Sequence, residues 1–430
     1  MLAAGARVVL PRQGGAWYVG AVLGEGGQGT VYELVPEAAG RRALALKWYR
    51  PEAIHPSQRA ALVRLVARPA PSSAFLWPTE LVDGEHGAFG YVMPLRPPES
   101  RPLADLLIGR VDVSFSTVTR LCMGLADAFL QLHAQGLCYR DISLGNVFFD
   151  VATGQPLICD NDNVGVDGEH AARVLGTARF MAPEIVRGEA QPSTATDLYS
   201  LAVLIFYVLM VHHPLQGRRE LHFACLDQAA EQQLFGDQPV FVFDPIDDSN
   251  APDPVVHPAV LRYWPLYPAY IRQEFIRAFT VGLANPQARV REGVWRSRLA
   301  RLLDGITACA CGRENFTDEG HAGQCWACGA DLPEPVRLEF GGRSLVLRAG
   351  ARLTRHHLRR DYDYAHVLGE VVAHPSRAGV WGLRNLSDAT WAMTLSEGDA
   401  SNDVPPGRAA GLVPGAVIDF GGGITARIVA

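Results

Sequence analysis

The sequence predicts an α+β chain in which a strand-rich first part is followed by a larger helical part and then by an all-β end. From Ala16 to about Tyr49, β-branched and aromatic runs alternate with glycine-rich turns, a pattern typical of strands. Long amphipathic stretches follow Pro102, and short strand-like runs separated by turn residues extend from Val336 to the end. Because a single hydrophobic core stops growing beyond ~250–300 residues, the 430 residues indicate two or three domains.

The composition is that of a globular protein and argues against some classes of binding partner. Hydrophobic residues make up 48% of the sequence and the formal net charge is −6, which argues against disorder and against a nucleic-acid partner. The longest apolar run, Leu198–Val211, has 14 residues and is interrupted by Ser200, whereas a membrane-spanning helix needs about 20. Because no signal peptide is recognisable after Met1, we expect a cytoplasmic protein with no membrane partner.

Helical periodicity is expected in five stretches. The first, Pro56–Ala67, carries its apolar residues on one face and interrupts the strand-rich part. The second, Ser116–Gln135, stops at Gly136, a residue type favoured at helix ends. The remaining three stretches are Leu198–Met210, Ile271–Leu283 and Trp295–Leu303.

A glycine-rich turn near the start has the composition of a phosphate-binding loop. Strand-like residues flank the run Gly24–Val31 (GEGGQGTV) on both sides, and the missing side chains let backbone N–H groups approach a phosphate chain closely. A plain hairpin turn is the alternative for such a run taken alone. Lys47 follows on an apolar strand, where a cation for the α- and β-phosphates is expected.

The most informative stretch, Tyr139–Val147, places an aspartate and an asparagine in one short loop before an apolar strand. Asp141 is suited to accept a proton from a substrate hydroxyl, and Asn146 is suited to ligate a metal that bridges phosphate oxygens. Asp160 follows one predicted hairpin later, where a second metal ligand is expected. Any one of these residues could belong to a simple turn, but the set favours phosphoryl transfer.

Two further features complete an ordered series of motifs. The segment Gly176–Glu184 contains the run Met-Ala-Pro-Glu, and Asp197 precedes a very apolar helix. Arg289 is a candidate buried cation that could pair with Glu184. In order and spacing, these motifs resemble those of bacterial Hanks-type serine/threonine protein kinases over residues 16–304.

The resemblance implies a two-lobed protein-kinase fold over residues 1–305, with a small lobe at about 16–95 and a larger lobe at about 96–305. It implies that Lys47 anchors ATP and that Asp141 is the catalytic base. It also implies that Asn146 and Asp160 hold Mg²⁺, and that Thr177 lies in the substrate-facing loop. The remaining residues of the implied nucleotide site are Gly24, Gly26, Gly27, Gly29, Val31 and Met93.

Several positions depart from the family pattern. Ser143 replaces a lysine that neutralises the transferring phosphate, and Gly145 provides no substitute cation. Asn161 and Asp162 replace a Phe-Gly pair, which removes an apolar packing residue and adds a carboxylate that could reach a metal. The helix after Lys47 contains no glutamate, so the Lys–Glu pair that marks an active kinase has no evident counterpart in the sequence.

These departures leave three functions open. The first is an atypical serine/threonine kinase that transfers the γ-phosphate of ATP to protein hydroxyls, and the second is a pseudokinase scaffold that binds nucleotide and partners without efficient transfer. A small-molecule phosphotransferase is the third, but Met181–Glu184 argues against it because this segment shapes a protein-substrate groove in the family. Arg173 and Thr177 are the evident switch residues of a segment poor in hydroxyls, so we do not expect control by phosphorylation there.

Four of the eight cysteines are clustered. Cys309 and Cys311 are followed, after 13 intervening residues, by Cys325 and Cys328, and four thiolates suit a tetrahedral, structural Zn²⁺. The alternatives are a disulfide pair or replacement of one cysteine by His321, and the expected reducing compartment disfavours disulfides. We therefore expect a zinc ribbon at residues 306–333.

Residues 336–430 resemble a forkhead-associated domain, a β-sandwich that binds phosphothreonine, mainly through the closing run Pro414–Gly421 (PGAVIDFG). Arg355 and Asn385 are the candidate remnants of its binding signature, and a purely structural sandwich is the alternative. The tripartite layout resembles bacterial kinases encoded beside a metal-dependent phosphatase and a von Willebrand A-domain protein. These two proteins are therefore expected partners, in addition to a protein substrate.

Overall fold

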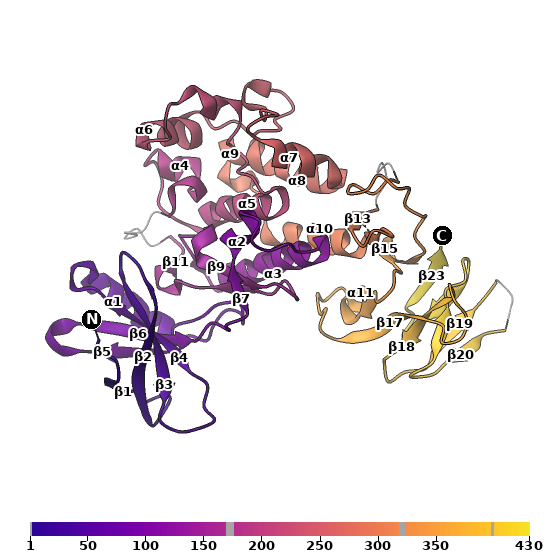
Figure 1. Ribbon diagram of the computed structural model, residues 1–430, viewed down its shortest axis with the longest axis horizontal. Helices are drawn as coiled ribbons and strands as arrows, with labels where there is room; N and C mark the ends of the chain where they lie inside the picture. Colours follow the sequence, from indigo (N-terminus) through magenta and orange to yellow (C-terminus); the bar gives the residue numbers. More distant parts are fainter. Residues whose placement is uncertain (1, 169–175, 318–322, 397–399) are drawn as a thin grey trace. The chain divides into compact units, whose positions relative to one another are not determined.

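The computed structural model describes residues 2–168, 176–317, 323–396 and 400–430 (Figure 1). Within these ranges, no helix is long and apolar enough to cross a membrane. The chain forms two compact units, each described here by itself. Unit 1 comprises Met1–Val113, Thr117–Trp264 and Tyr270–Ser297, and unit 2 comprises Ser114–Ser116, Pro265–Ala269 and Arg298–Ala430.

Unit 1 begins with a six-stranded antiparallel sheet in the order β1-β2-β3-β4-β6-β5, drawn in indigo and purple in Figure 1. Alternating side chains give the sheet two faces. Tyr32, Leu34, Leu46 and Val92 are buried in the core on one face, which leaves Lys47 on the other. The strands are β1 (Arg7–Val9), β2 (Ala16–Glu25), β3 (Gly29–Pro36), β4 (Leu44–Tyr49), β5 (Glu80–Asp83) and β6 (Phe89–Pro94), and helix α1 (Pro56–Val66) follows β4.

The rest of unit 1 is largely helical and is built around α5 (Thr194–Met210), which is buried along most of its length. Ser193 caps this helix through a capping box with Thr196, and Val211, with φ of 53°, ends it. The Phe206 ring packs edge to face against the Phe279 ring, with centroids 5.9 Å apart. The other helices that lie wholly or partly in unit 1 are α2 (Leu103–Leu107), α3 (Phe115–His133), α4 (Pro183–Val186), α6 (Gln228–Glu231), α7 (Pro258–Tyr263), α8 (Ala269–Phe279), α9 (Val281–Ala284) and α10 (Glu292–Asp304).

One expected helix is divided in the structure. The stretch 271–283 was predicted as continuous, but α8 ends at Phe279 and α9 begins at Val281. Thr280, between them, has φ of −122° and ψ of −84°, and its hydroxyl donates a hydrogen bond to the Ile276 carbonyl at 2.7 Å. Such a side-chain bond competes with the helical backbone bonds, and hydrophobic periodicity does not register it.

Short hairpins position the loops that carry the candidate site. β9 (Val147–Asp150) pairs antiparallel with β10 (Pro156–Ile158), so the two ends of this hairpin lie side by side. As a result the Cys159 N–H donates to the Asn146 carbonyl at 3.0 Å. β9 also pairs with β7 (Ser100–Pro102), and β8 (Leu137–Cys138) pairs with β11 (Gly165–Val166).

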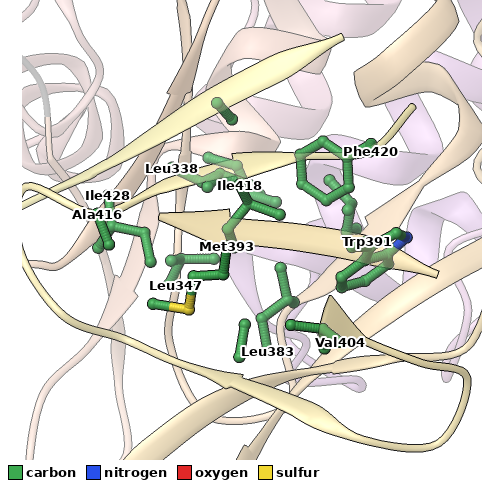
Figure 2. Packing of buried hydrophobic residues seen from close by; sticks show 14 of the residues in the cluster. Leu338, Leu347, Leu383, Trp391, Met393, Val404, Ala416, Ile418, Phe420 and Ile428 are labelled. Atoms are coloured by element: carbon green, nitrogen blue, oxygen red, sulfur yellow. The ribbon is translucent and has the colours of Figure 1, made fainter. Parts of the chain in front are cut away.

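Unit 2 contains two antiparallel sheets that share one hydrophobic core (Figure 2). The first has the order β15-β14-β23-β22-β19-β20 and the second the order β16-β17-β18-β21. In this core the Trp391 and Phe420 rings meet edge to face, with centroids 5.0 Å apart. The elements are β14 (Arg337–Phe340), β15 (Arg343–Val346), β16 (Arg352–Thr354), α11 (Arg355–Arg359), β17 (Val367–Ala373), β18 (Trp381–Asn385), β19 (Trp391–Thr394), β20 (Asn402–Val404), β21 (Ala409–Gly411), β22 (Val417–Asp419) and β23 (Thr425–Val429).

The two candidate remnants of a phosphothreonine signature have structural contacts in unit 2. The Arg355 guanidinium pairs with Asp361 at 2.6 Å and with Asp363 at 2.9 Å. Asn385 is fully buried and its amide donates to the Ala389 and Val404 carbonyls at 2.7 and 2.9 Å. Asn385 therefore braces a turn in the structure.

Candidate active site

The glycine-rich run forms the tip of the β2–β3 hairpin. A Cβ added to Gly29 would lie 2.2 Å from the Trp48 carbonyl oxygen, so the close approach of β4 requires glycine there. Apart from chain neighbours, no described atom lies within 4 Å of a Cβ built on Gly24, Gly26 or Gly27. These three positions border open space, which is the room that a phosphate chain needs.

Strand register places three predicted nucleotide-site residues on one face of the sheet. Val31 pairs directly with Lys47 across β3 and β4, and Met93 pairs with Ala45 across β4 and β6. Directly paired residues share a face, as do residues two apart on one strand. Val31, Lys47 and Met93 therefore lie on the face opposite to the Leu46 core.

Lys47 is 5% exposed and its ammonium contacts two carboxylates. Its Nζ lies 2.9 Å from Asp162 Oδ2 and 3.5 Å from Asp160 Oδ1, and it donates to Gln28 Oε1 at 3.0 Å. Burial by itself would lower the pKa of Lys47, but the charges of Asp162 and Asp160 overcome this effect and raise the pKa. The lysine is therefore held in its charged form.

Asp162 supplies the carboxylate partner that the sequence of α1 lacks. Its side chain is 1% exposed, and its oxygens accept hydrogen bonds from the Tyr49 hydroxyl at 2.5 Å and the Tyr91 hydroxyl at 3.1 Å, besides those from Lys47. Burial by itself would raise the pKa of Asp162, but these donors lower it. Because the carboxylate faces the sheet, the structure does not support the expectation that it reaches a metal.

Asp160 lies in a different environment, two residues earlier in the same turn. Its backbone is left-handed, with φ of 53°, and its side chain is 43% exposed. Desolvation raises the pKa of Asp160, and the nearby charge of Asp162 adds to the rise while Lys47 opposes it. A divalent cation would offset this cost, and carboxylate and amide oxygens are the ligands that Mg²⁺ prefers. Asp160 and Asn146 therefore fit a magnesium site.

The predicted catalytic aspartate lies in a hydrogen-bonded group of three side chains. Asn146 Nδ2 donates to the Asp141 carbonyl at 2.9 Å and to its Oδ2 at 3.0 Å. The Thr177 hydroxyl donates to Asp141 Oδ1 at 2.8 Å. Asp141 is thus oriented from two sides, and one of its donors is an aliphatic hydroxyl.

Asp197 at the start of α5 anchors the loop that carries Asp141. Its buried carboxylate accepts hydrogen bonds from the Tyr139 N–H at 2.5 Å and the Arg140 N–H at 3.0 Å. Arg140 has φ of 74°, a strained value that these bonds hold in place. The Tyr139 hydroxyl donates to the Cys159 carbonyl, so this tyrosine ties the loop to the residue before Asp160.

His133, at the end of α3, contacts Asp197 and holds its carboxylate in place. One imidazole nitrogen lies 3.1 Å from Asp197 Oδ2, and the other bonds to Glu292. Burial opposes protonation, but hydrogen bonds and charges from both carboxylates raise the pKa of His133 to about 9. A buried, charged histidine therefore links α3, α5 and α10.

The pair predicted between Glu184 and Arg289 is present. Arg289 Nη2 donates to Glu184 Oε2 at 2.7 Å, and the guanidinium also donates to the carbonyls of Gly282 at 3.1 Å and Ala195 at 2.8 Å. The Arg289 side chain is 2% exposed. The pair fixes the end of the Met-Ala-Pro-Glu segment.

Sequence reasoning missed four residues of the site. Tyr49 lies two positions after Lys47 on the same strand, so strand alternation alone could have placed both on one face. Predicting Tyr91 would have required the register between β4 and β6. Predicting Gln28 and His133 would have required knowledge of their contacts in the folded chain, which no local sequence pattern indicates. Arg173 and His321 lie outside the described residues.

The clustered cysteines of unit 2 meet at one point. Cys309 and Cys311 follow β12 (Ile306–Ala308), which pairs with β13 (Glu314–Phe316). The Sγ atoms of all four clustered cysteines lie within 4.8 Å of one another, and two pairs are 3.6 and 3.7 Å apart. Four thiolates bound at ~2.3 Å to a tetrahedral Zn²⁺ lie about 3.8 Å apart, so the arrangement fits that ion.

Comparison with known proteins shows which protein family carries these motifs. The family model described as the protein kinase domain matches residues 17–240, about half of the chain. A probable serine/threonine-protein kinase of Streptomyces coelicolor is 28% identical over 219 residues, which cover 48% of this chain and 32% of that protein. A DNA damage-responsive serine/threonine-protein kinase of Deinococcus radiodurans is 30% identical over 253 residues, covering 56% and 35%.

The serine/threonine-protein kinase AfsK of Streptomyces coelicolor gives a similar result. It is 28% identical over 211 residues, which cover 48% of this chain and 26% of AfsK. The chain thus spans about a third or less of the length of these curated relatives.

Proposed function

The chain belongs to the protein kinase family, and on that premise we propose that it transfers the γ-phosphate of ATP to serine or threonine hydroxyls of proteins. The single observation that carries the proposal is the hydrogen bond from the Thr177 hydroxyl to Asp141 Oδ1 at 2.8 Å. Asp141 is held where it accepts a hydrogen bond from an aliphatic hydroxyl, which is the group that such a substrate would present.

Each candidate residue then has a defined part in the reaction. Asp141 orients the substrate hydroxyl and accepts its proton, and Lys47 holds the α- and β-phosphates. Asn146 and Asp160 hold Mg²⁺, which when bound supplies positive charge against the phosphate oxygens. The nucleotide site combines the glycine-rich run with the sheet face that carries Lys47: Gly24, Gly26, Gly27, Gly29, Val31 and Met93.

The direct test is transfer of γ-phosphate from labelled ATP to the chain itself or to a general protein substrate, in the presence of Mg²⁺. The Asp141→Ala and Asp160→Ala variants should lose transfer, because each lacks a group that acts on the reacting atoms. If both variants label their substrate as strongly as the parent, the activity comes from a contaminating kinase and the proposal fails.

The second candidate function is a pseudokinase scaffold. It is favoured by Ser143, which leaves the loop without the usual lysine, and by Asn161, a fully buried amide in place of an apolar packing residue. The buried pair between Lys47 and Asp162 weighs against it, because a charged lysine is retained where phosphates would bind. A nucleotide-dependent thermal shift without turnover would favour the scaffold.

The proposal extends to the rest of the chain. We assign residues 1–305 to a kinase domain, 306–333 to a zinc ribbon and 336–430 to a forkhead-associated-like sandwich. The spacing of the four Sγ atoms supports a structural Zn²⁺ at Cys309, Cys311, Cys325 and Cys328. The shared core of the two sheets supports a sandwich in the last segment.

Partners and location form the last part of the proposal. A metal-dependent phosphatase and a von Willebrand A-domain protein are the partners to test first, on the analogy of domain layout. A cytoplasmic location agrees with the free cysteines of the described residues, because reducing compartments keep thiols unpaired.

A further inference from the structure

We propose that Asp162 positions Lys47 for phosphate binding and transfer, in place of the glutamate that a helix supplies in the family pattern. This inference rests on the proposed kinase function and deepens it. It begins from an arrangement of four side chains: the Lys47 ammonium, the Asp162 carboxylate, and the hydroxyls of Tyr49 and Tyr91.

The sheet register brings three donors to a single carboxylate. Lys47 and Tyr91 are directly paired across β4 and β6, and Tyr49 lies two residues after Lys47 on β4, so all three side chains share a face. Lys47 Nζ lies 3.0 and 2.9 Å from the two oxygens of Asp162. Tyr49 donates to Oδ2 and Tyr91 to Oδ1, so both oxygens are bonded twice.

A buried ion pair such as Lys47–Asp162 is stable only if its polar atoms form enough hydrogen bonds. Removing two charges from water is unfavourable, and this cost is offset only when the geometry of the pair is good and the remaining lone pairs accept hydrogen bonds. Here the two tyrosine hydroxyls satisfy them. Burial and the Asp162 charge raise the pKa of Tyr49 and of Tyr91, so both hydroxyls keep the protons that they donate. The Lys47 ammonium is therefore held in one place by a fixed partner.

The position of Asp162 changes which element controls Lys47. Asp162 and Asp160 belong to one turn, Asp160–Asn163, so a movement of that turn displaces the lysine partner and a proposed metal ligand together. Helix α1 (Pro56–Val66) carries no carboxylate in its sequence. A cavity of about 390 Å³ is lined by its residues Ser57, Gln58, Ala61 and Arg64 together with the segment 162–165. Lys47 is thus tied to the metal-binding turn, with no carboxylate from α1.

The first test replaces the carboxylate by an amide of the same shape. We expect Asp162→Asn to lower kcat about 100-fold, because small misplacements of reacting groups carry penalties of that size. The KM for ATP should rise by much less. The matched control is Asp83→Asn, which breaks an exposed pair with Arg59 of α1 at 2.9 Å and should leave kcat and KM unchanged.

A second measurement separates positioning from folding. Tyr49→Phe keeps the ring and removes one donor to the buried carboxylate, so we expect a thermal midpoint lowered by a few degrees. At a temperature where the variant is fully folded, we expect kcat to fall roughly tenfold. Gln58 of α1 acts on the Tyr49 hydroxyl, which in turn bonds to Asp162, so Gln58→Glu brings a carboxylate next to this group. The double variant Asp162→Asn/Gln58→Glu should recover part of the lost kcat.

Failure of the proposed role of Asp162 can be distinguished from failure of the proposed kinase function. If the parent transfers phosphate and Asp162→Asn and Tyr49→Phe both do so equally well, the inference is overturned and the kinase function stands. If the parent does not transfer phosphate, the function fails, and calorimetric titration with Mg²⁺ and a non-hydrolysable ATP analogue decides the inference. Asp162→Asn should then bind roughly tenfold more weakly than the parent and Asp83→Asn, and equal affinity overturns the proposal.

Discussion

At the scale of single residues, two aspartates of one turn have opposite environments. Asp160 has a side chain that is 43% exposed and a raised pKa, whereas Asp162 is buried to 1% exposure and has a lowered pKa. Burial raises a carboxyl pKa, but a buried carboxylate that accepts several hydrogen bonds stays charged. Because of this difference, Asp160 is accessible to a metal ion, whereas Asp162 is the buried partner of Lys47.

The missing loop lysine leads to a test at Gly145. Apart from chain neighbours, Ser143 Oγ, at 3.9 Å, is the one described atom within 4 Å of a Cβ built on Gly145, which is exposed. A side chain fits there, so Gly145→Arg should place a cation near the transferring phosphate and raise kcat roughly tenfold. Steady-state kinetics with Gly145→Ala as the control would check this. An unchanged kcat in Gly145→Arg would show that another cation already fills the role.

His133 predicts a dependence of stability on pH. Its ordinary pKa is 6.5 and its folded pKa is raised to about 9, so protonation is favoured in the folded state. Its contribution is fully present below pH 6.5 and is lost as the pH rises through about 9. The shift corresponds to about 3 kcal/mol.

The check is the urea midpoint of the parent and of His133→Gln at pH 6 and pH 9.5. The parent should be less stable at pH 9.5 than at pH 6. His133→Gln should be less stable than the parent at pH 6, and its stability should change less between the two pH values. His374→Gln, at an exposed histidine, is the control. Parallel pH profiles for the parent and His133→Gln would contradict the assignment.

The sequence named candidate residues for the site more readily than the contacts between them. Motif order pointed to Lys47, Asp141, Asn146 and Asp160 as candidates, because each belongs to a local pattern. The partner of Lys47 was not predictable, since Asp162 is separated from it by 115 positions and meets it through the packing of the sheet against a turn. The sequence showed a glutamate missing and an aspartate added, but not that one compensates for the other.

At the scale of elements, a buried ion pair joins the Met-Ala-Pro-Glu segment to the chain after α9. Arg289 is 2% exposed in its side chain and lies 2.7 Å from Glu184. We expect Glu184→Gln to destabilise unit 1 by about 3–5 kcal/mol, because it leaves a buried guanidinium without its counter-charge. Asp83→Asn, at an exposed pair, should cost less than about 1 kcal/mol. Urea unfolding compares them, and equal losses would contradict this account.

The cysteine hairpin gives a second test at this scale. We expect the purified chain to contain one zinc ion, and Cys325→Ser to lose it because a tetrahedral site needs all four ligands. Elemental analysis by mass spectrometry would measure the content. The control is Cys225→Ser, which changes an exposed cysteine outside the cluster and should retain the metal. A parent free of zinc after purification without chelators would contradict the zinc site.

At the scale of the whole molecule, the sequence predicted the order of segments more fully than their internal architecture. Five ordered motifs indicated a kinase fold, and the family match over residues 17–240 agrees with this. The last segment was expected to be all-β, and it contains two sheets around one core. Its strand order could not be predicted, because strands adjacent in space, such as β14 and β23, lie far apart in the chain.

The measurement that tests the central claim most directly combines binding and transfer on one preparation. The parent and Asp141→Asn are both saturated with Mg²⁺ and labelled ATP, nucleotide affinity is measured, and phosphoserine and phosphothreonine in the product are quantified. We predict equal affinities, with transfer in the parent and at least a 100-fold loss in Asp141→Asn. Equal transfer by both proteins, or tight binding by both with no transfer by either, would contradict the claim that this chain is a serine/threonine kinase.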